Sequence, residues 1–192
     1  MHPDPIHLLL ARHGQTDWNR VHRLQGRTDV PLNDEGRRQA AALAGSLETE
    51  RVDAARVSPL QRARQTAAAI EALRADVRFT EEPRLAEIHM GRWEGVLEAD
   101  LAADPAYSAW RTDPVRANCP GGEGALDVAR RVAPLLDELA ALSPGTRVLL
   151  LGHQFTNAVI LCLVGGIPLD AVRTQLAAPG EFRRTVLAHR GG

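Results

Sequence analysis

Short apolar runs alternate with longer segments of helical periodicity along the chain. The runs are too short for buried helices and are typical of strands; they lie at 8–10, 54–57, 77–80, 147–152 and 183–188. The segments with apolar residues at helical spacing lie at 33–50, 58–73, 123–142 and 155–164, and shorter helices are expected within 97–118. This alternation predicts an α/β fold with a mainly parallel central sheet flanked by helices on both faces, the strand at 183–188 lying at an edge. With no repeat or linker, 1–192 is predicted to be a single domain.

Two of the predicted helices carry start signals. Asn33 is expected to cap the first, and Ser58 with Gln61 three residues later has the pattern of a capping box for the second. Arg62 and Arg64 then fall in the first turns, where a positive charge has the wrong sign for the helix dipole. Two solvated surface arginines would explain them. A bound anion would explain them too, because free N–H groups and a guanidinium both favour it.

Polar side chains follow the two most apolar strands at the point where each strand ends. Arg12, His13 and Gly14 follow the first, and His153 follows 147–152. In open parallel sheets, ligand crevices form at the carboxyl ends of the strands. Both imidazoles are therefore expected at one crevice, with Gly14 letting the backbone approach a ligand. Glu87, among apolar neighbours, is a further candidate; a polar strand end, a core histidine and a surface acid would be the non-functional explanations.

Composition and charge narrow the classes of function. The chain is 44% hydrophobic, and 23 Lys and Arg against 24 Asp and Glu give a formal net charge of -1. It lacks the basic field that nucleic-acid binding requires. Cys119 and Cys162 have no metal-type spacing. Because no apolar run is long enough for a signal or a membrane span, we expect neither a leader nor a transmembrane helix. We expect a soluble cytoplasmic protein with reduced thiols and no nucleic-acid or membrane partner. A single disulfide and a homodimer stay open.

A zinc site and a phosphate site compete as interpretations of these residues. Imidazoles with a carboxylate could hold zinc, but the chain has no HExxH or paired-cysteine pattern, and arginines at the site would repel a cation. Guanidiniums and imidazoles suit a phosphoryl group, one imidazole acting as nucleophile while the other groups stabilise charge. We predict a small phosphorylated substrate, with no metal and no cofactor.

Four blocks then identify a resemblance. RHGQT with Trp18 and Asn19, SPLQRARQT, LAEIHMGRWEG and LGH occur in the order seen in the histidine phosphatase superfamily, the phosphoglycerate mutase-like group, over about 8–166. The resemblance implies catalysis through a phosphohistidine, with His13 as nucleophile and Glu87 as proton donor. Arg12, Arg62 and His153 would complete the catalytic set. The substrate-binding set implied is Arg12, Asn19, Gln25, Gly26, Arg62, His153 and Gln154.

The physical demands on two of these residues fit the implied roles. His13 must attack through an unprotonated nitrogen, and positive neighbours would lower its pKa while attracting the substrate dianion. Glu87 must arrive protonated, give its proton to the leaving alkoxide and then act as base for water. An apolar setting, with Leu85 and Ile88 nearby, would favour the neutral acid.

The branch of the family is less well marked. Mutases carry a longer insertion after the acid, whereas 92–121 is short, and LQGRTDVPLNDEGRRQA with PGGE resembles small bacterial phosphatases, including α-ribazole phosphatases and broad-specificity enzymes. This predicts a metal-independent phosphomonoester hydrolase acting on α-ribazole phosphate, a sugar phosphate or a phosphoglycerate. Gln154 and Phe155 replace the usual glycine-rich stretch, and the glutamine also resembles the fructose-2,6-bisphosphatase branch. A cofactor-dependent phosphoglycerate mutase and a non-catalytic phospho-ligand binding module stay open as well.

Some residues are not ranked by the sequence. Four arginines could contact a second anionic group on the substrate or lie solvated at the surface: Arg20, Arg23, Arg92 and Arg116. Three tryptophans could form pocket walls or ordinary packing: Trp18, Trp93 and Trp110. The 97–118 region could cover a pocket.

Overall fold

A central five-stranded sheet organises the chain. The structure is a computed structural model that describes residues 3–189. The strand order is β3-β2-β4-β1-β5, and only β5 runs antiparallel to its neighbour. The strands are β1 (Ile6–Arg12), β2 (Ala54–Val57), β3 (Phe79–Glu81), β4 (Arg147–Gly152) and β5 (Phe182–Leu187). The mainly parallel sheet and the edge position of β5 are as predicted. The third strand starts two residues late because the Val77 N–H is used in a turn, donating to the Arg74 carbonyl.

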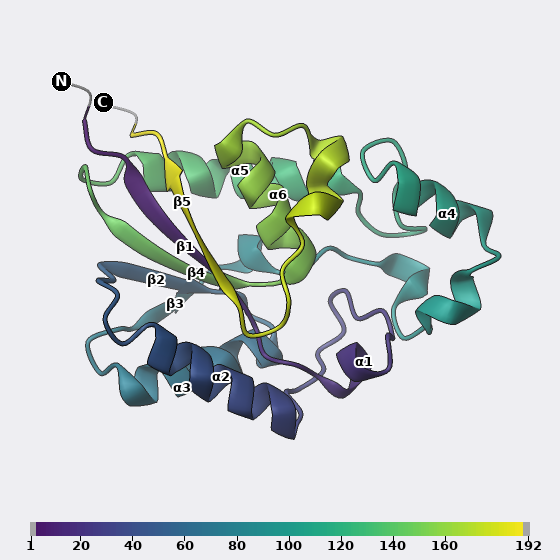
Figure 1. Ribbon diagram of the computed structural model, residues 1–192. Coiled ribbons are helices and arrows are strands. Elements are labelled where there is room, and N and C mark those ends of the chain that lie inside the picture. The colour runs from purple at the N-terminus through teal and green to yellow at the C-terminus, as the bar shows by residue number, and fades with distance from the viewer. Residues whose placement is uncertain (1–2, 190–192) are drawn as a thin grey trace.

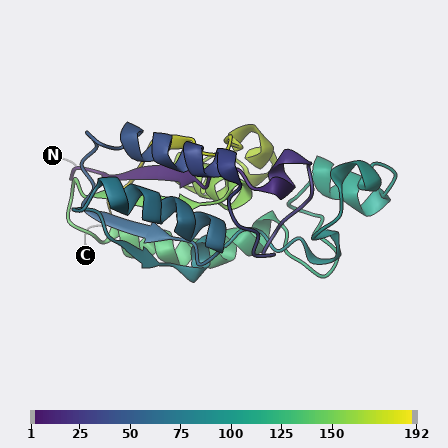
Figure 2. The same cartoon turned by 90° about the horizontal axis from the view of Figure 1, so that it is seen from below.

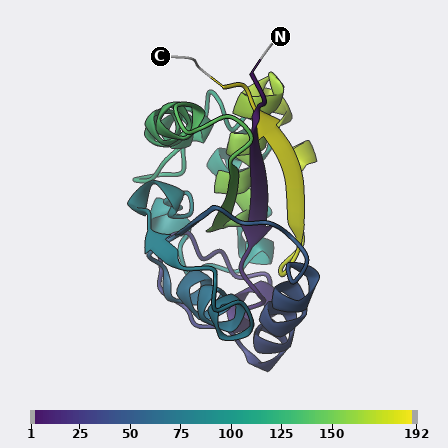
Figure 3. The same ribbon diagram turned by 90° about the vertical axis from the view of Figure 1, so that its left-hand side faces the viewer.

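Helices cover both faces of the sheet, as predicted. The α-helices are α1 (Asp17–Arg20), α2 (Asp34–Ser46), α3 (Gln61–Leu73), α4 (Pro105–Thr112), α5 (Ala125–Ala140) and α6 (Gln154–Gly165). The 3-10 helices are η1 (Pro83–Leu85), η2 (Gly91–Trp93), η3 (Glu98–Leu101) and η4 (Leu169–Gln175). One layer holds α2 and α3, the other α5 and α6 (Figures 1 and 3). The segment containing α4 projects beyond the carboxyl end of β1 (Figure 2).

The two central strands bury side chains alternately on the two faces. Leu8 and Leu10 of β1 lie in the core beneath α5 and α6, whereas Leu9 lies in the core shared with α2 and α3. In β4, Leu150 and Leu151 divide in the same way. Because successive side chains of a strand point to opposite faces, a continuous apolar run is needed where both faces are covered. Both strands are thus fixed at the centre of the sheet.

One of the two predicted helix starts is wrong. Asn33 caps α2, its side chain accepting from the Gly36 N–H at 2.8 Å. Ser58 does not cap α3, which begins at Gln61 after Leu60 and has no capping box. The Gln61 N–H donates to the carboxylate of Asp29, 2.6 Å away and 32 residues earlier. A partner distant in sequence therefore takes the place of the predicted local cap.

Gly14 makes room for a helix. A Cβ atom on Gly14 would lie 2.2 Å from the Gly36 carbonyl oxygen, and one on Gly36 would lie 2.0 Å from the Gln15 carbonyl oxygen. Contacts this short are sterically forbidden, and the obstructing atoms are backbone on both sides. The close approach predicted for a ligand at Gly14 is thus made by the first turn of α2.

Gly36→Ala is expected to lower the free energy of unfolding by about 1–3 kcal/mol, the cost of overpacking a well-packed contact. Gly45→Ala in the same helix is the matched control, because a Cβ there meets nothing within 4 Å. That change should stabilise by about 0.5–1 kcal/mol, since alanine is the better helix former. Urea denaturation of both variants measures the two effects. Equal effects of the same sign would contradict the steric explanation.

The structure also describes the two cysteines, the groups that could bind a metal ion and the length of the apolar helices. Cys119 and Cys162 are buried free thiols. Within residues 3–189, no group of three or more His, Cys, Asp or Glu side chains could hold a metal ion. No single helix in that part of the chain is long and apolar enough to cross a membrane. Only α6 and η4 taken together, bent by 120° at the break between them, pass on length and composition.

Candidate active site

A cavity of about 410 Å³ opens at the carboxyl ends of β1 and β4. Every predicted site residue lines it except His153, which is fully buried. The predicted lining residues are Arg12, His13, Asn19, Gln25, Gly26, Arg62, Glu87 and Gln154. The topology brings them together because β1 and β4 are neighbours, with Arg12 paired to Gly152. A histidine follows each of these strands directly, so both histidines lie at the same edge of the sheet.

The two imidazoles lie side by side. Their ring centroids are 4.9 Å apart. His13 Nδ1 lies 2.6 Å from the Gly14 carbonyl oxygen, which can only accept, so Nδ1 carries the proton. Arg62 Nε donates to His13 Nε2 at 3.2 Å, so that nitrogen holds the lone pair. The backbone thus selects the tautomer in which Nε2 is the nucleophilic atom.

Arg12 and Arg62 are buried guanidiniums tied down by carbonyl oxygens. Arg62 donates to the carbonyls of Thr28 at 3.0 Å and Gly26 at 2.8 Å, and Arg12 donates to that of Ala177 at 2.6 Å. Burial lowers the pKa of each arginine to about 10, and the Glu87 carboxylate opposes this shift. Both therefore stay charged at neutral pH, and their positions are fixed before any ligand arrives.

Two buried polar atoms of the predicted site residues lack a hydrogen-bond partner among the described residues: Arg12 Nε and His153 Nδ1. His153 Nε2 lies 2.7 Å from Ser58 Oγ. This contact explains what the Ser58 side chain does instead of capping α3. The orphaned nitrogens are costly in a folded protein unless a ligand completes them. Arg12 lines the cavity, so an oxyanion bound there would accept from its Nε.

The pKa values of His13 and His153 are both lowered well below the ordinary value, chiefly by burial and then by the positive charge of Arg62. The folded protein thus holds two neutral imidazoles. In the unfolded chain they take up protons as the pH falls below about 6.5. Because only the unfolded state then binds these protons, stability should fall as the pH drops through this range.

His153→Gln is expected to reduce this acid sensitivity. One histidine of strongly lowered pKa costs at most about 1.4 kcal/mol when the pH falls from about 8 to about 5.5. The variant should lose less stability than the wild type over this interval by up to that amount. Urea denaturation at the two pH values provides the comparison. An equal loss in both proteins would show that His153 is not the neutral group.

The Glu87 carboxyl has a more polar setting than predicted. Its Oε1 accepts from the backbone N–H of Ile88 at 2.9 Å and of Thr156 at 3.1 Å, and from the Thr156 hydroxyl at 3.1 Å. Its Oε2 accepts from the Phe155 N–H at 3.2 Å. The first turn of α6 supplies most of these donors. Leu85 and Ile88 are buried nearby, but they do not enclose the carboxyl in an apolar pocket.

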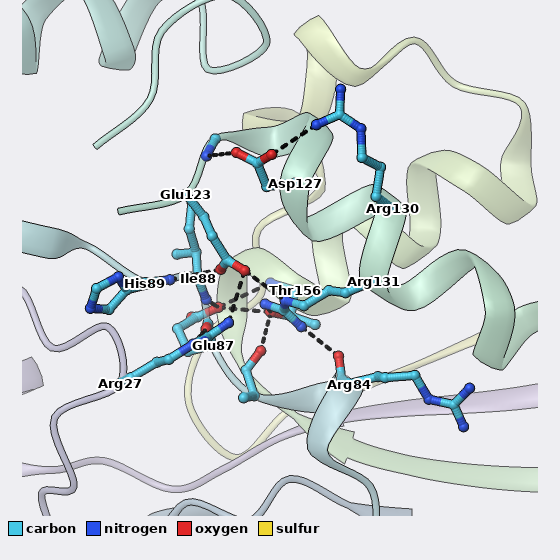
Figure 4. Close-up of polar contacts among 12 residues, drawn as sticks. Arg27, Arg84, Glu87, Ile88, His89, Glu123, Asp127, Arg130, Arg131 and Thr156 are labelled. Atoms are coloured by element: carbon cyan, nitrogen blue, oxygen red, sulfur yellow. Dashed lines mark hydrogen bonds and ion pairs between the residues drawn. The ribbon is translucent and has the colours of Figure 1, made fainter. Parts of the chain in front are cut away.

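A second layer of charges holds the Glu87 segment in place (Figure 4). Arg131 of α5 reaches between Glu123 and Thr156, donating at 3.1 Å and 3.2 Å. Glu123 also accepts from the His89 N–H at 2.9 Å. The acid is therefore positioned from both sides of its own loop, by α5 and by α6.

The three side-chain amides of the predicted substrate-binding set line the same cavity as Arg12, His13 and Arg62. Asn19 closes a capping box with Thr16 at the start of α1, its Oδ1 accepting from the Thr16 N–H at 3.1 Å. Gln25 Oε1 accepts from the Thr16 hydroxyl at 2.9 Å. Thr16 thus occupies the acceptor oxygens of both amides, which leaves their N–H₂ groups as donors. Gln154 Nε2 donates to the Ala177 carbonyl at 3.3 Å.

The structure shows which of the arginines and tryptophans left unranked by the sequence line the cavity. Of the four arginines only Arg23 lines the cavity, and of the three tryptophans only Trp110 does. Arg64, the second arginine of the predicted anion site, is half exposed and pairs with Glu81 instead. Sequence reasoning missed a further group that forms the outer wall of the cavity: His22, Glu98, Tyr107, Arg111 and Arg173. No spacing pattern marks them, because they come from separate segments.

Comparisons of the sequence and of the structure with known proteins point to one family. Residues 8–191 match the histidine phosphatase superfamily (branch 1). A glucosyl-3-phosphoglycerate phosphatase of Mycolicibacterium vanbaalenii is 38% identical over 172 residues, covering 85% of this chain and 76% of that protein. A mycobacterial glucosyl-3-phosphoglycerate phosphatase solved with VO3 is 32% identical, with a TM-score of 0.83 over 96% of this chain and 99% of that one. An α-ribazole phosphatase from Shigella flexneri is 26% identical, with a TM-score of 0.83 over 95% and 96%. The chain belongs to the histidine phosphatase superfamily.

Proposed function

We propose that the chain is a phosphomonoester hydrolase that works through a phosphohistidine at His13. The observation that carries the proposal is the state of this imidazole: buried, neutral, with Nδ1 tied to the Gly14 carbonyl and the Nε2 lone pair facing Arg62. The names of the similar proteins support a phosphatase. A small phosphorylated metabolite fits a cavity of about 410 Å³.

In the first step the phosphoryl group binds beside the hydrogen-bond donors of Arg12 and Arg62. Arg12 Nε is unpartnered among the described residues, and Arg12 lines the cavity, so this nitrogen can donate to a phosphoryl oxygen. His153 supports the nucleophile from behind, with its ring centroid 4.9 Å from that of His13. The hydrogen bond from Arg62 Nε passes from His13 Nε2 to a phosphoryl oxygen, which frees the lone pair on His13 Nε2. His13 Nε2 then forms a bond to phosphorus as the bond from phosphorus to the ester oxygen breaks. The guanidiniums stabilise the charge on the equatorial oxygens.

The leaving oxygen takes the broken electron pair and a proton from Glu87. Because Oε1 already accepts three hydrogen bonds and Oε2 only one, Oε2 is the atom suited to carry the proton. In the second step the Glu87 carboxylate takes a proton from water as the water oxygen bonds to phosphorus. The bond from phosphorus to His13 Nε2 breaks, phosphate leaves and the starting state returns.

The test is phosphate release by the purified chain, in EDTA, from glucosyl-3-phosphoglycerate, phosphoserine, α-ribazole phosphate, 3-phosphoglycerate and a sugar phosphate. We expect release that EDTA does not reduce, with a clear order among the esters. Release that stops in EDTA and returns with a divalent cation would overturn the proposed mechanism. Isomerisation of 3-phosphoglycerate with bisphosphoglycerate present, without net release, would instead establish a mutase.

A further inference from the structure

The outer part of the cavity carries hydrogen-bond donors that no described residue accepts from. Arg173 of η4 stacks on the indole of Trp110, with its Cζ 4.4 Å from the ring centroid, and both line the cavity. Arg173 Nε, Arg173 Nη2 and Trp110 Nε1 are buried atoms with no hydrogen-bond partner within the described chain. A planar guanidinium held over an aromatic ring can bind an oxyanion with two parallel N–H groups.

Positive charge exceeds negative charge around the cavity. Among the described residues, five arginines line it against only two glutamates, Glu87 and Glu98, in a chain of net charge -1. Glu98 is ion-paired with Arg111 and accepts from the Tyr107 hydroxyl at 2.8 Å. Glu87 is bound by the first turn of α6. Arg23 and Arg173 therefore have no carboxylate partner among the residues that line the cavity.

Arg173 belongs to a different end of the cavity from the phosphoryl site. Arg173 stacks on Trp110 of α4, and Tyr107, which stacks on the same indole, donates to Glu98. Arg12 and Arg62 lie instead at the end of β1 and the start of α3, where they donate to the carbonyls of Ala177, Thr28 and Gly26. The positive groups of the cavity therefore come from two different sets of elements. One substrate that reaches both would carry two anionic groups.

We propose that Arg173, with the Trp110 N–H beside it, is a subsite for a second oxyanion, a carboxylate or a second phosphate, on the leaving group of the substrate. The inference rests on the proposed phosphatase function and deepens it. It limits the substrate to esters with a second anionic group: the phosphoryl group binds at Arg12, Arg62 and His13, while the other end of the molecule is held by Arg173. Uncharged sugars or alcohols as leaving groups would leave the outer donors unsatisfied.

Matched pairs of esters that differ only in the second charge test the subsite. 3-Phosphoglycerate is compared with glycerol 3-phosphate, and 6-phosphogluconate with glucitol 6-phosphate, for a carboxylate at two distances. Fructose 1,6-bisphosphate is compared with fructose 6-phosphate for a second phosphate. We expect the charged member to have a kcat/KM higher by about 10-fold or more in at least one pair, because two charge-assisted hydrogen bonds are gained.

Arg173→Gln should lower kcat/KM for the preferred charged member by about 10- to 100-fold and change its neutral partner by less than about 3-fold. Arg116→Gln is the matched control, since it removes one arginine with an 89% exposed side chain outside the cavity. It should behave as the wild type with every ester. An equal fall for both members of each pair in Arg173→Gln would overturn the subsite, because a merely structural role would affect both alike.

A binding measurement separates this proposal from the proposed function. Calorimetry of each ester with the His13→Ala protein, and with His13→Ala/Arg173→Gln, needs no turnover. Tighter binding of the charged member that is lost in the double variant supports the subsite even if no ester is hydrolysed. If the wild type hydrolyses the neutral and charged esters equally and binding shows no preference, the subsite fails while the phosphatase function stands.

Discussion

Replacing His13 by alanine is expected to lower phosphate release from every phosphomonoester by about 10⁴-fold or more, the scale seen when a covalent nucleophile is removed. The loss follows from geometry, because His13 Nε2 faces the phosphoryl donors of the cavity with an unprotonated lone pair. His153 cannot substitute, because it is fully buried and does not line the cavity. The measurement is steady-state phosphate release.

Chemical trapping gives this prediction a second readout. Rapid mixing with a ³²P-labelled ester followed by an alkaline quench should leave label on the wild-type chain, since a phosphoramidate survives base and is lost in acid. The His13→Ala chain should take up none. The His89→Ala variant, which removes a half-exposed imidazole that does not line the cavity, is the control and should label as the wild type does. Label that persists in His13→Ala would move the nucleophile to another residue.

Glu87→Gln is expected to slow hydrolysis of an alkyl phosphate by about 10²- to 10⁴-fold, the usual contribution of a general acid or base. The amide keeps the shape of the carboxyl but has no proton of suitable acidity to give. The alkoxide then leaves unprotonated, so kcat should fall far more than KM rises.

The leaving group supplies the internal control for this variant. p-Nitrophenolate leaves without protonation, so the burst of p-nitrophenol from its phosphate ester should be slowed much less than the alkyl ester is. Release of phosphate from the labelled chain should remain slow, because Glu87 also activates water. Equal slowing of both esters in the burst phase would contradict a role as proton donor and leave Glu87 a positioning residue.

The sheet and the inner part of the site could be predicted because local sequence determines them. Leu8 to Leu10 must be apolar on both faces, and the residue after each central strand must lie at the crevice. The helix cap predicted at Ser58 was wrong because the N-terminus of α3 binds Asp29, a partner that no local pattern reveals. Its hydroxyl contacts His153 across 95 residues instead.

The outer wall could not be predicted for a related reason. Trp110 and Arg173 come from α4 and η4, and they meet only because an aromatic cluster packs α4 against the start of α6. In that cluster Trp110 lies 5.8 Å from both Trp93 and Phe155. The apolar surroundings expected for Glu87 were also inferred from neighbours in sequence, whereas its actual neighbours are N–H groups of a helix that begins at residue 154.

Because α4 projects beyond the sheet layers (Figure 2), its segment should open more easily than the sheet does. The histidines extend from β1 and β4, whose amides are paired on both sides in the middle of the sheet. Their hydrogen exchange should require global unfolding, whereas the α4 segment should exchange through local opening. The Trp110 side of the proposed subsite thus lies in a part of the fold that can vary without disturbing the catalytic centre. We expect libraries at 97–118, combined with changes at Arg173, to alter the preference among esters while phosphate release is kept.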